Sequence, residues 1–172
     1  MSTVYFSLGS NRGNKEKNLF QAIVYLREYV GEIADYSSIY ESEPWGFNDS
    51  EDFFNMVIKV ETELPPRRIL EIIKTIEERM GRVLTRDGYQ SRIIDIDILL
   101  CDQLVIKEKD LQIPHLQINE RNFVLFPLTD IAADIINPTC KKTFNDLIKV
   151  CKDEKEIGLF KHRSQIQGVM NF

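Results

Sequence analysis

The chain has 172 residues, of which 43% are hydrophobic and 28% charged, a composition typical of a globular protein with a substantial core. We therefore expect a single domain spanning residues 1–172. The formal net charge of −5 argues against a general nucleic-acid binder, which should carry a basic excess. No apolar stretch approaches the length of a membrane span and no basic leader precedes the first apolar run, so we expect a cytoplasmic protein. The three cysteines have neither a disulfide pattern nor metal-ligand spacing.

The first part of the chain predicts a strand, a turn, a helix and a second strand. Residues 3–8 have the composition of a strand, and residues 9–14 form a turn with two glycines and two asparagines. A helix with apolar residues at helical spacing follows, beginning after a cap at Asn14 and ending at Gly31. The turn lacks both the Lys-Ser/Thr ending of a Walker loop and the three glycines of a dinucleotide fingerprint, so we interpret it as structural. Residues 33–42 predict the second strand.

The next loop and strand hold two side chains that invite a ligand. Residues 43–52 form a polar loop with the only tryptophan of the chain, Trp45, which either closes over a ligand or anchors the loop to the core. Residues 53–61 predict a third strand with one fully apolar face. Its other face carries Asn55, and a buried amide needs partners. Asn55 therefore either bonds a neighbouring loop or reads the polar edge of a planar ligand.

A second helix is expected between Pro65 and Gly81. Glu77 lies beside its apolar stripe near the helix C-terminus, where the dipole does not favour an acid, so we interpret it as a solvated side chain with a ligand role as the alternative. Residues 81–92 then contain three arginines and one aspartate in an otherwise acidic chain. Such a loop offers groups that bind phosphate oxygens.

The chain is organised around residues 92–100, an apolar, β-branched run with two acids. In a strand alternate side chains share a face, so Asp95 and Asp97 point the same way with their Cα atoms about 7 Å apart. The opposite face is predicted to be an apolar row ending at Leu100. Two like charges beside apolar residues are costly without a positive partner, and Arg92 precedes them. The pattern favours a metal or phosphate site over an ordinary solvated strand face.

The order strand, helix, strand, strand, helix, strand predicts an α+β fold of the ferredoxin-like type, a mainly antiparallel sheet flanked by helices. The helices would cover one face, and the other face, with Asn55 and the two aspartates, would line a cleft. A short helix ending at Pro127 and a further helix over residues 143–151 follow. The polar tail from Lys152 onward predicts nothing specific. An arginine-rich loop that leads into a two-aspartate strand indicates a metal–nucleotide site.

These residues together resemble a known family, the 6-hydroxymethyl-7,8-dihydropterin pyrophosphokinases of folate biosynthesis. The resemblance covers residues 3–138 and leaves residues 139–172 as a C-terminal helix and tail. Its most specific motif is the run Arg-Ile-Ile-Asp-Ile-Asp-Ile-Leu at residues 92–99. The other matching motifs are residues 8–11 with Gly13, 53–55, 81–82, 114–115, Arg121 with Phe123, and 127–128.

The resemblance implies transfer of a pyrophosphoryl group from ATP to the hydroxymethyl oxygen of the pterin, with release of AMP. It also implies two Mg²⁺ ions, held by Asp95 and Asp97. Catalysis is thereby assigned to Arg82, Arg92 and Asp97. The ATP contacts implied are Glu77, Arg82, Arg92, Ile98, His115 and Arg121. The pterin contacts implied are Ser42, Pro44, Trp45, Phe53, Asn55, Tyr89 and Phe123, with Asn55 reading the ring edge and the two phenylalanines stacking on the ring.

Several positions depart from the family pattern. Members usually have Trp-Gly-Pro where this chain has residues 89–91, Tyr-Gln-Ser, so a ring is kept and a glycine is lost. Phe53 stands where Tyr is common, Leu116 where Tyr is frequent, and Leu84 where some members have Arg. None of these changes removes a metal ligand, the core arginine or the pterin-reading amide. We therefore expect the chain to be active, and we expect these departures to alter its affinity for the nucleotide.

Two alternatives stay open. A different nucleotidyltransferase on a ferredoxin-like palm would also bind Mg-ATP, but it would release pyrophosphate rather than AMP. A non-catalytic binding module of the same fold would release no AMP. For the pyrophosphokinase, the loops over residues 43–52 and 81–91 are expected to close over both substrates. We expect a monomer that binds these small molecules and neither nucleic acid nor membrane.

Overall fold

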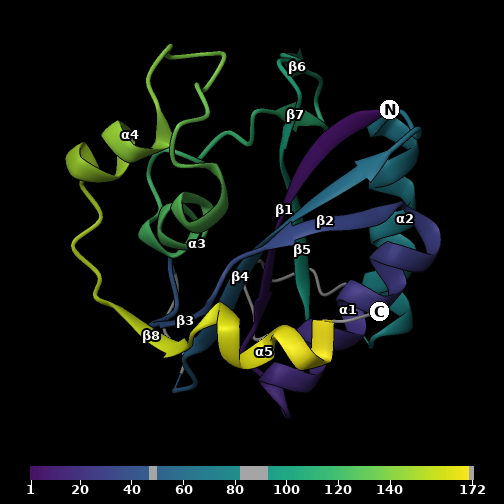
Figure 1. Ribbon diagram of the computed structural model, residues 1–172, viewed down its shortest axis with the longest axis vertical. Coiled ribbons are helices and arrows are strands. Elements are labelled where there is room, and N and C mark those ends of the chain that lie inside the picture. The colour runs from purple at the N-terminus through teal and green to yellow at the C-terminus, as the bar shows by residue number, and fades with distance from the viewer. Residues whose placement is uncertain (47–49, 82–92, 171–172) are drawn as a thin grey trace.

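The computed structural model describes residues 1–46, 50–81 and 93–170. Within them a six-stranded sheet, antiparallel at every pairing, runs through the centre of the molecule (Figure 1). In sheet order its strands are β5 (Asp95–Cys101), β1 (Ser2–Ser10), β4 (Phe53–Thr62), β3 (Ile39–Ser42) and β8 (Ile157–Lys161), and β2 (Glu32–Tyr36) also pairs with β4. A hairpin of β6 (Ile106–Lys107) and β7 (Gln112–Ile113) stands apart. The α+β prediction is confirmed.

The first face of the sheet is covered by α1 (Lys15–Tyr29) and α2 (Pro66–Arg79) (Figure 1). As predicted, Asn14 caps α1 by accepting a hydrogen bond from the backbone N–H of Lys17 at 3.0 Å. Apolar side chains of both helices pack onto the alternate residues of β1, β4 and β5 to form the larger core. Its fully buried members include Phe6, Leu8, Leu19, Ile23, Met56, Ile58 and Ile69.

The two helices of the predicted strand–helix order, α1 and α2, lie on one face as expected, but two later helices cover part of the second face. Here α3 (Asn122–Ala132) and α4 (Phe144–Val150) pack over Tyr5 and Val57 (Figure 1). Pro127 does not end α3, contrary to the prediction. A proline inside a helix removes one backbone hydrogen bond, but Leu125 and Leu128 are fully buried on either side of it, and this burial keeps the helix continuous.

A bulge changes which face the end of β5 presents. Tyr5 pairs with Leu100 while Phe6 pairs with Ile98, so one residue of β5 is extra. The inserted residue reverses the alternation of side chains. Leu100 therefore joins the core of the second face, where the sequence placed it on the first, and Cys101 joins the first. Asp95 and Asp97 precede the bulge and keep their common face.

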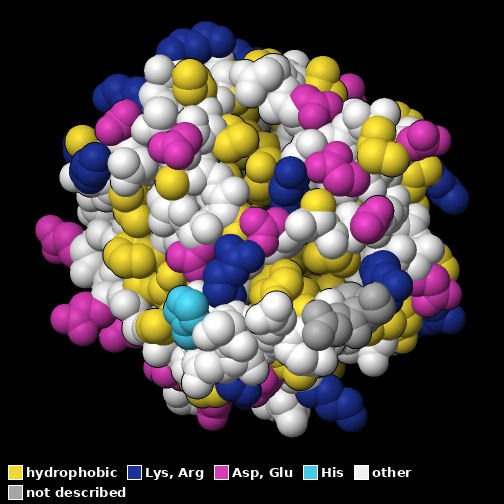
Figure 2. Space-filling model, in the orientation of Figure 1, with side chains coloured by type: hydrophobic (Ala, Val, Ile, Leu, Met, Phe, Trp, Pro, Cys, Tyr) yellow, Lys and Arg dark blue, Asp and Glu magenta, His cyan; other side chains and the backbone are white. Residues whose placement is uncertain are grey.

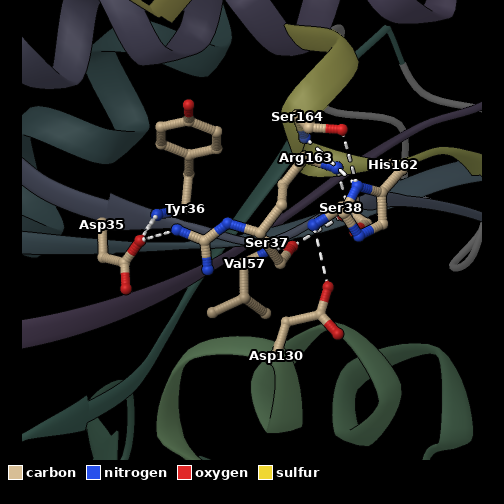
Figure 3. Close-up of polar contacts among 9 residues, drawn as sticks. All are labelled: Asp35, Tyr36, Ser37, Ser38, Val57, Asp130, His162, Arg163 and Ser164. Carbon is tan, nitrogen blue, oxygen red and sulfur yellow. Dashed lines mark hydrogen bonds and ion pairs between the residues drawn. The ribbon is translucent and has the colours of Figure 1, made fainter. Parts of the chain in front are cut away.

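The predicted second strand is two strands, and the polar tail is ordered against the break between them. At the break, the Ser37 hydroxyl accepts a hydrogen bond from the N–H of Val57, and the N–H of Ser38 donates to Asp130 (Figure 3), both at 2.9 Å. The tail contributes β8 and then α5 (Arg163–Met170). The N–H of Arg163 donates to the Ser38 hydroxyl at 3.2 Å. These contacts join the end of the described chain to the sheet.

On the face shown in Figure 2, acidic and basic side chains of the described residues are interspersed rather than gathered by sign. None of the helices in the described ranges is long and apolar enough to cross a membrane.

Candidate active site

The candidate site lies on the second face of the sheet, where β4, β1 and β5 run side by side. Gly9 of β1 pairs with Asn55 on one side and with Asp95 on the other, so these three residues form one row across three strands. In the next row Ser7 pairs with Asp97. Because neighbouring strands lie about 4.8 Å apart, the Cα atoms of Asn55 and Asp95 are about 10 Å apart. The structure thus brings together the amide and the two carboxylates that the sequence placed on one face.

Gly9 leaves the centre of this row open. A Cβ atom at Gly9 would lie 3.4 Å from Oδ1 of Asn55 and 3.7 Å from the ring of Phe53. Among the described residues that are not chain neighbours of Gly9, no other atom lies within 4 Å of that position, so the glycine leaves space between the amide and the two carboxylates. Gly9 was expected to begin the turn over residues 9–14, but it lies within β1. Its position in the site follows from the strand register, which pairs Gly9 with both Asn55 and Asp95.

The amide of Asn55 is held in a fixed orientation. Its Nδ2 donates a hydrogen bond to the hydroxyl of Ser42, the last residue of β3, at 2.8 Å, and both side chains are buried. The amide oxygen consequently lies beside Gly9. Of the two alternatives for Asn55, a bond to a neighbouring segment is therefore present. That bond leaves the oxygen turned toward the gap, where a ligand edge could reach it.

Arg121 connects α3 to the described part of the loop that carries Trp45, residues 43–46, which we call the tryptophan loop. Its side chain is 8% exposed, and its guanidinium carbon lies 4.5 Å from the ring centre of Trp45 and 5.6 Å from that of Phe123. It also donates to the side chain of Gln117. Its Nε is buried without a hydrogen-bond partner among the described residues. Trp45 is thus neither exposed nor inserted into the core, because it stacks on a cation at the rim of the site.

His115 lines a cleft of about 260 Å³ beside the two-aspartate strand, together with Asp97 and Ile98. Burial, and secondarily the charge of Arg121, lower the pKa of His115 to about 4, although Asp95 opposes the shift. The ring is therefore neutral at pH 7. Its Nδ1 accepts a hydrogen bond from the N–H of Gln117 at 3.2 Å, which assigns the ring hydrogen to Nε2.

Glu77 is buried, so the expectation of a solvated side chain is wrong. Its carboxylate is 5% exposed and accepts a hydrogen bond from the N–H of Ile96 at 2.9 Å. Since β5 is the edge strand of the sheet that the described residues form, alternate N–H groups along it have no strand partner within that sheet. Glu77 satisfies the one that lies between the two aspartates. The sequence contained no signal for this contact.

The predicted Mg²⁺ site can be compared with the side chains that are available as metal ligands. Within the described ranges, no three His, Cys, Asp or Glu side chains gather as a metal cluster. Asp95 and Asp97, both half-buried and on one face, nevertheless fit Mg²⁺, which is commonly held by one or two carboxylates and the phosphates of a substrate. The predictions for Arg82, Tyr89 and Arg92 lie outside the described residues.

Fold and site together define a class. An antiparallel α+β sheet presents two carboxylates and a neutral imidazole suited to a metal-bound phosphate substrate. Beside them are an amide and aromatic rings suited to a flat substrate. This combination is that of a group-transfer enzyme with two small substrates.

Comparison with known sequences gives the family. The family model for 7,8-dihydro-6-hydroxymethylpterin-pyrophosphokinase matches residues 5–133. The chain is 40% identical over 146 residues to the 2-amino-4-hydroxy-6-hydroxymethyldihydropteridine pyrophosphokinase of Aquifex aeolicus, covering 85% of this chain and 90% of that protein. It is 44% identical over 143 residues to the folic acid synthesis protein FOL1 of Dictyostelium discoideum, covering 83% of this chain and 21% of that larger protein. The chain belongs to the pyrophosphokinase family, as the resemblance predicted.

Solved structures agree on the fold. The wild-type HPPK-DHPS of Plasmodium falciparum superposes with a TM-score of 0.71 at 19% identity, covering 86% of this chain and 44% of that one. A triple mutant of the same protein gives a TM-score of 0.72 at 20% identity. This chain spans less than half the length of these solved chains, and the likeness shows the shared fold.

Proposed function

We propose that this chain carries out the reaction of its family with the residues described above, as a single cytoplasmic, monomeric domain spanning residues 1–172. The reaction transfers a pyrophosphoryl group from ATP, the co-substrate, to 6-hydroxymethyl-7,8-dihydropterin in folate synthesis. Its products are the pterin diphosphate and AMP. The observation that supports the site assignment is the row Asn55, Gly9 and Asp95, in which the amide proposed to read the ring and a carboxylate proposed to hold metal lie on either side of Gly9.

The pterin is assigned to the β4 side of the gap. The fixed oxygen of Asn55 accepts a hydrogen bond from the polar edge of the ring, and the Ser42 hydroxyl holds the amide in that orientation. Phe53 and Phe123 stack on the two faces of the ring, where offset stacking adds to the burial of apolar surface. Further pterin contacts are assigned to Pro44, Trp45 and Tyr89.

ATP is assigned to the cleft on the β5 side. Ile98 lines the cleft and offers apolar surface to the base, while the neutral His115 donates its Nε2–H to an oxygen of the nucleotide. Arg121, whose Nε is buried without a described partner, gains an acceptor when a phosphate is present. The remaining contacts, with Glu77, Arg82 and Arg92, are assigned by resemblance. The two arginines track the transferring phosphates and stabilise their charge.

Asp95 and Asp97 would hold two Mg²⁺ ions. When bound, Mg²⁺ neutralises phosphate charge and lowers the pKa of the attacking hydroxyl. The chain itself contributes positioning. The sheet separates the Cα atoms of Asn55 and Asp95 by about 10 Å across Gly9, and this spacing would let the hydroxymethyl group and the β-phosphorus meet in line.

The test is the release of AMP from Mg-ATP and 6-hydroxymethyl-7,8-dihydropterin by the purified chain. Asp97→Ala is expected to abolish turnover while pterin binding survives, because ring stacking and Asn55 do not use the metal. Asn55→Leu is the matched control, because it should weaken pterin binding first. Release of pyrophosphate instead of AMP would indicate a nucleotidyltransferase. Near-wild-type turnover by Asp97→Ala in Mg²⁺ would show that the metal assignment is wrong.

A further inference from the structure

The segment that follows α4 lies beyond the residues that the family model matches, yet it reaches the rim of the pterin site. It runs from α4 to β8, along a hollow that Trp45 lines together with Asp153. Two of its side chains, Asp153 and Lys155, contact opposite walls of the site. We call this pair the tail clasp. The backbone N–H of Lys155 donates to the carboxylate of Asp153 at 3.2 Å, so the two residues form one local unit.

Asp153 holds the beginning of α3. The N-cap residue of this helix, Arg121, makes no side-chain capping bond. Instead, the carboxylate of Asp153 accepts a hydrogen bond from the backbone N–H of Asn122 at 2.9 Å. The backbone carbonyl oxygen of Asp153 accepts a second one from the side-chain amide of Asn122 at 2.6 Å. A carboxylate at a helix N-terminus satisfies a free N–H and interacts favourably with the helix dipole. The helix turn that carries Arg121 and Phe123 is thus fixed by a residue 31 positions away.

Lys155 holds the tryptophan loop on the other wall. Its ammonium group donates a hydrogen bond to the carbonyl oxygen of Pro44 and lies 3.9 Å from the carboxylate of Glu43. Two residues later the chain enters β8, where Ile157 pairs with Ser42. Without β8 the strand β3 would form the edge of the sheet, and Ser42 is the residue that orients Asn55. The tail therefore fixes this wall at the loop and at the strand.

Between the two walls, Trp45 stacks on Arg121 at 4.5 Å. We propose that Asp153 and Lys155 are positioning residues that hold residues 43–45 and the first turn of α3 at the spacing a stacked pterin requires. This inference rests on the proposed pterin roles of Ser42, Trp45 and Phe123. The clasp itself touches no substrate. Because the clasp already orders the loop in the ligand-free protein, the loop loses less conformational entropy when the pterin binds.

The test compares two lysines of the same tail. Lys155→Met removes the clasp contact, and Lys161→Met removes a contact with Glu16 at the other end of β8. The two side chains are 35% and 31% exposed, so both truncations should leave the fold intact. Because Trp45 is the only tryptophan, acrylamide quenching of its emission reports on the loop directly in the ligand-free protein. Initial rates give KM for pterin and for ATP.

We expect Lys155→Met to increase the quenching of Trp45 and to raise the pterin KM about tenfold, as the loss of one charge-assisted hydrogen bond allows, with little change in the ATP KM. Lys155→Arg should restore both values, since Arg can donate to the same carbonyl oxygen. Lys161→Met should change neither. Asp153→Ala is the second variant. By removing the contact with α3 it should also raise the pterin KM and leave the ATP KM nearly unchanged.

Unchanged quenching in both Lys155→Met and Asp153→Ala would overturn the clasp. Increased quenching with an unchanged pterin KM would overturn its positioning role. Equal changes in the pterin and ATP values would do the same, because they would indicate a general structural effect. If the wild-type chain released no AMP, the proposed function would fail, while the quenching comparison would still decide whether the clasp holds the loop.

Discussion

Filling the gap at Gly9 tests the site without disturbing the fold. In Gly9→Ala the new methyl group lies 3.4 Å from the Asn55 oxygen and 3.7 Å from the Phe53 ring, which are ordinary contact distances. The backbone of Gly9 does not have a positive φ. Alanine is also favoured over glycine within a strand by about 0.5–1 kcal/mol. The free energy of unfolding should therefore stay the same or increase slightly.

Binding should respond in the opposite direction. The methyl group stands against the amide oxygen on the side from which the pterin edge would approach. Loss of one hydrogen bond to a buried amide costs about 1–3 kcal/mol, and about 1.4 kcal/mol corresponds to a tenfold change in Kd. We expect the pterin Kd to rise about 5- to 150-fold above that of the wild type. The Kd for ATP in the cleft of His115 should change much less.

The assay is a calorimetric titration of pterin and of an ATP analogue, combined with thermal unfolding. Gly158→Ala is the matched control, because this strand glycine lies in β8 and a Cβ there would meet only the Glu41 carbonyl oxygen at 3.9 Å. Its pterin Kd should equal that of the wild type. Unchanged pterin binding in Gly9→Ala, with an unchanged melting temperature, would refute the reasoning that the ligand occupies the gap beside Asn55.

Two further predictions concern stability. Since the folded-state pKa of His115, about 4, lies below the usual 6.5, the unfolded chain takes up a proton that the folded chain does not as the pH falls through this range. The stability that neutral His115 contributes is thus present above pH 6.5 and is lost between pH 6.5 and 4, by up to about 3 kcal/mol. His115→Gln should remove this part of the pH dependence in urea unfolding. Glu77→Ala leaves the Ile96 N–H without its acceptor and should cost about 1–3 kcal/mol, whereas Glu77→Gln, which keeps an oxygen, should cost less.

Each stability prediction has an internal reference. Equal slopes for the wild type and His115→Gln between pH 6.5 and 4 would contradict the shifted pKa. For Glu77, equal losses in the alanine and glutamine variants would show that the hydrogen bond to β5 is not what the carboxylate contributes.

Local patterns in the sequence determined much of the site. Alternation along residues 92–100 placed Asp95 and Asp97 on one face, because the period of a strand does not depend on what surrounds it. The cap at Asn14 was predicted for the same reason, since the side chain bonds a backbone group three residues away. Asn55 was singled out by its chemistry, as an amide on an otherwise apolar strand.

Only the tertiary structure decided the contacts between distant segments. The bulge that turns Leu100, the burial of Glu77 and the continuation of α3 through Pro127 each depend on a neighbour that local periodicity does not specify. The tail is the clearest case. Its polar composition predicted nothing, yet it adds β8 to the sheet and bonds the backbone of Asn122 and Pro44 through Asp153 and Lys155. Strand pairing and helix capping use backbone groups that every residue carries, so such contacts leave little trace in the sequence.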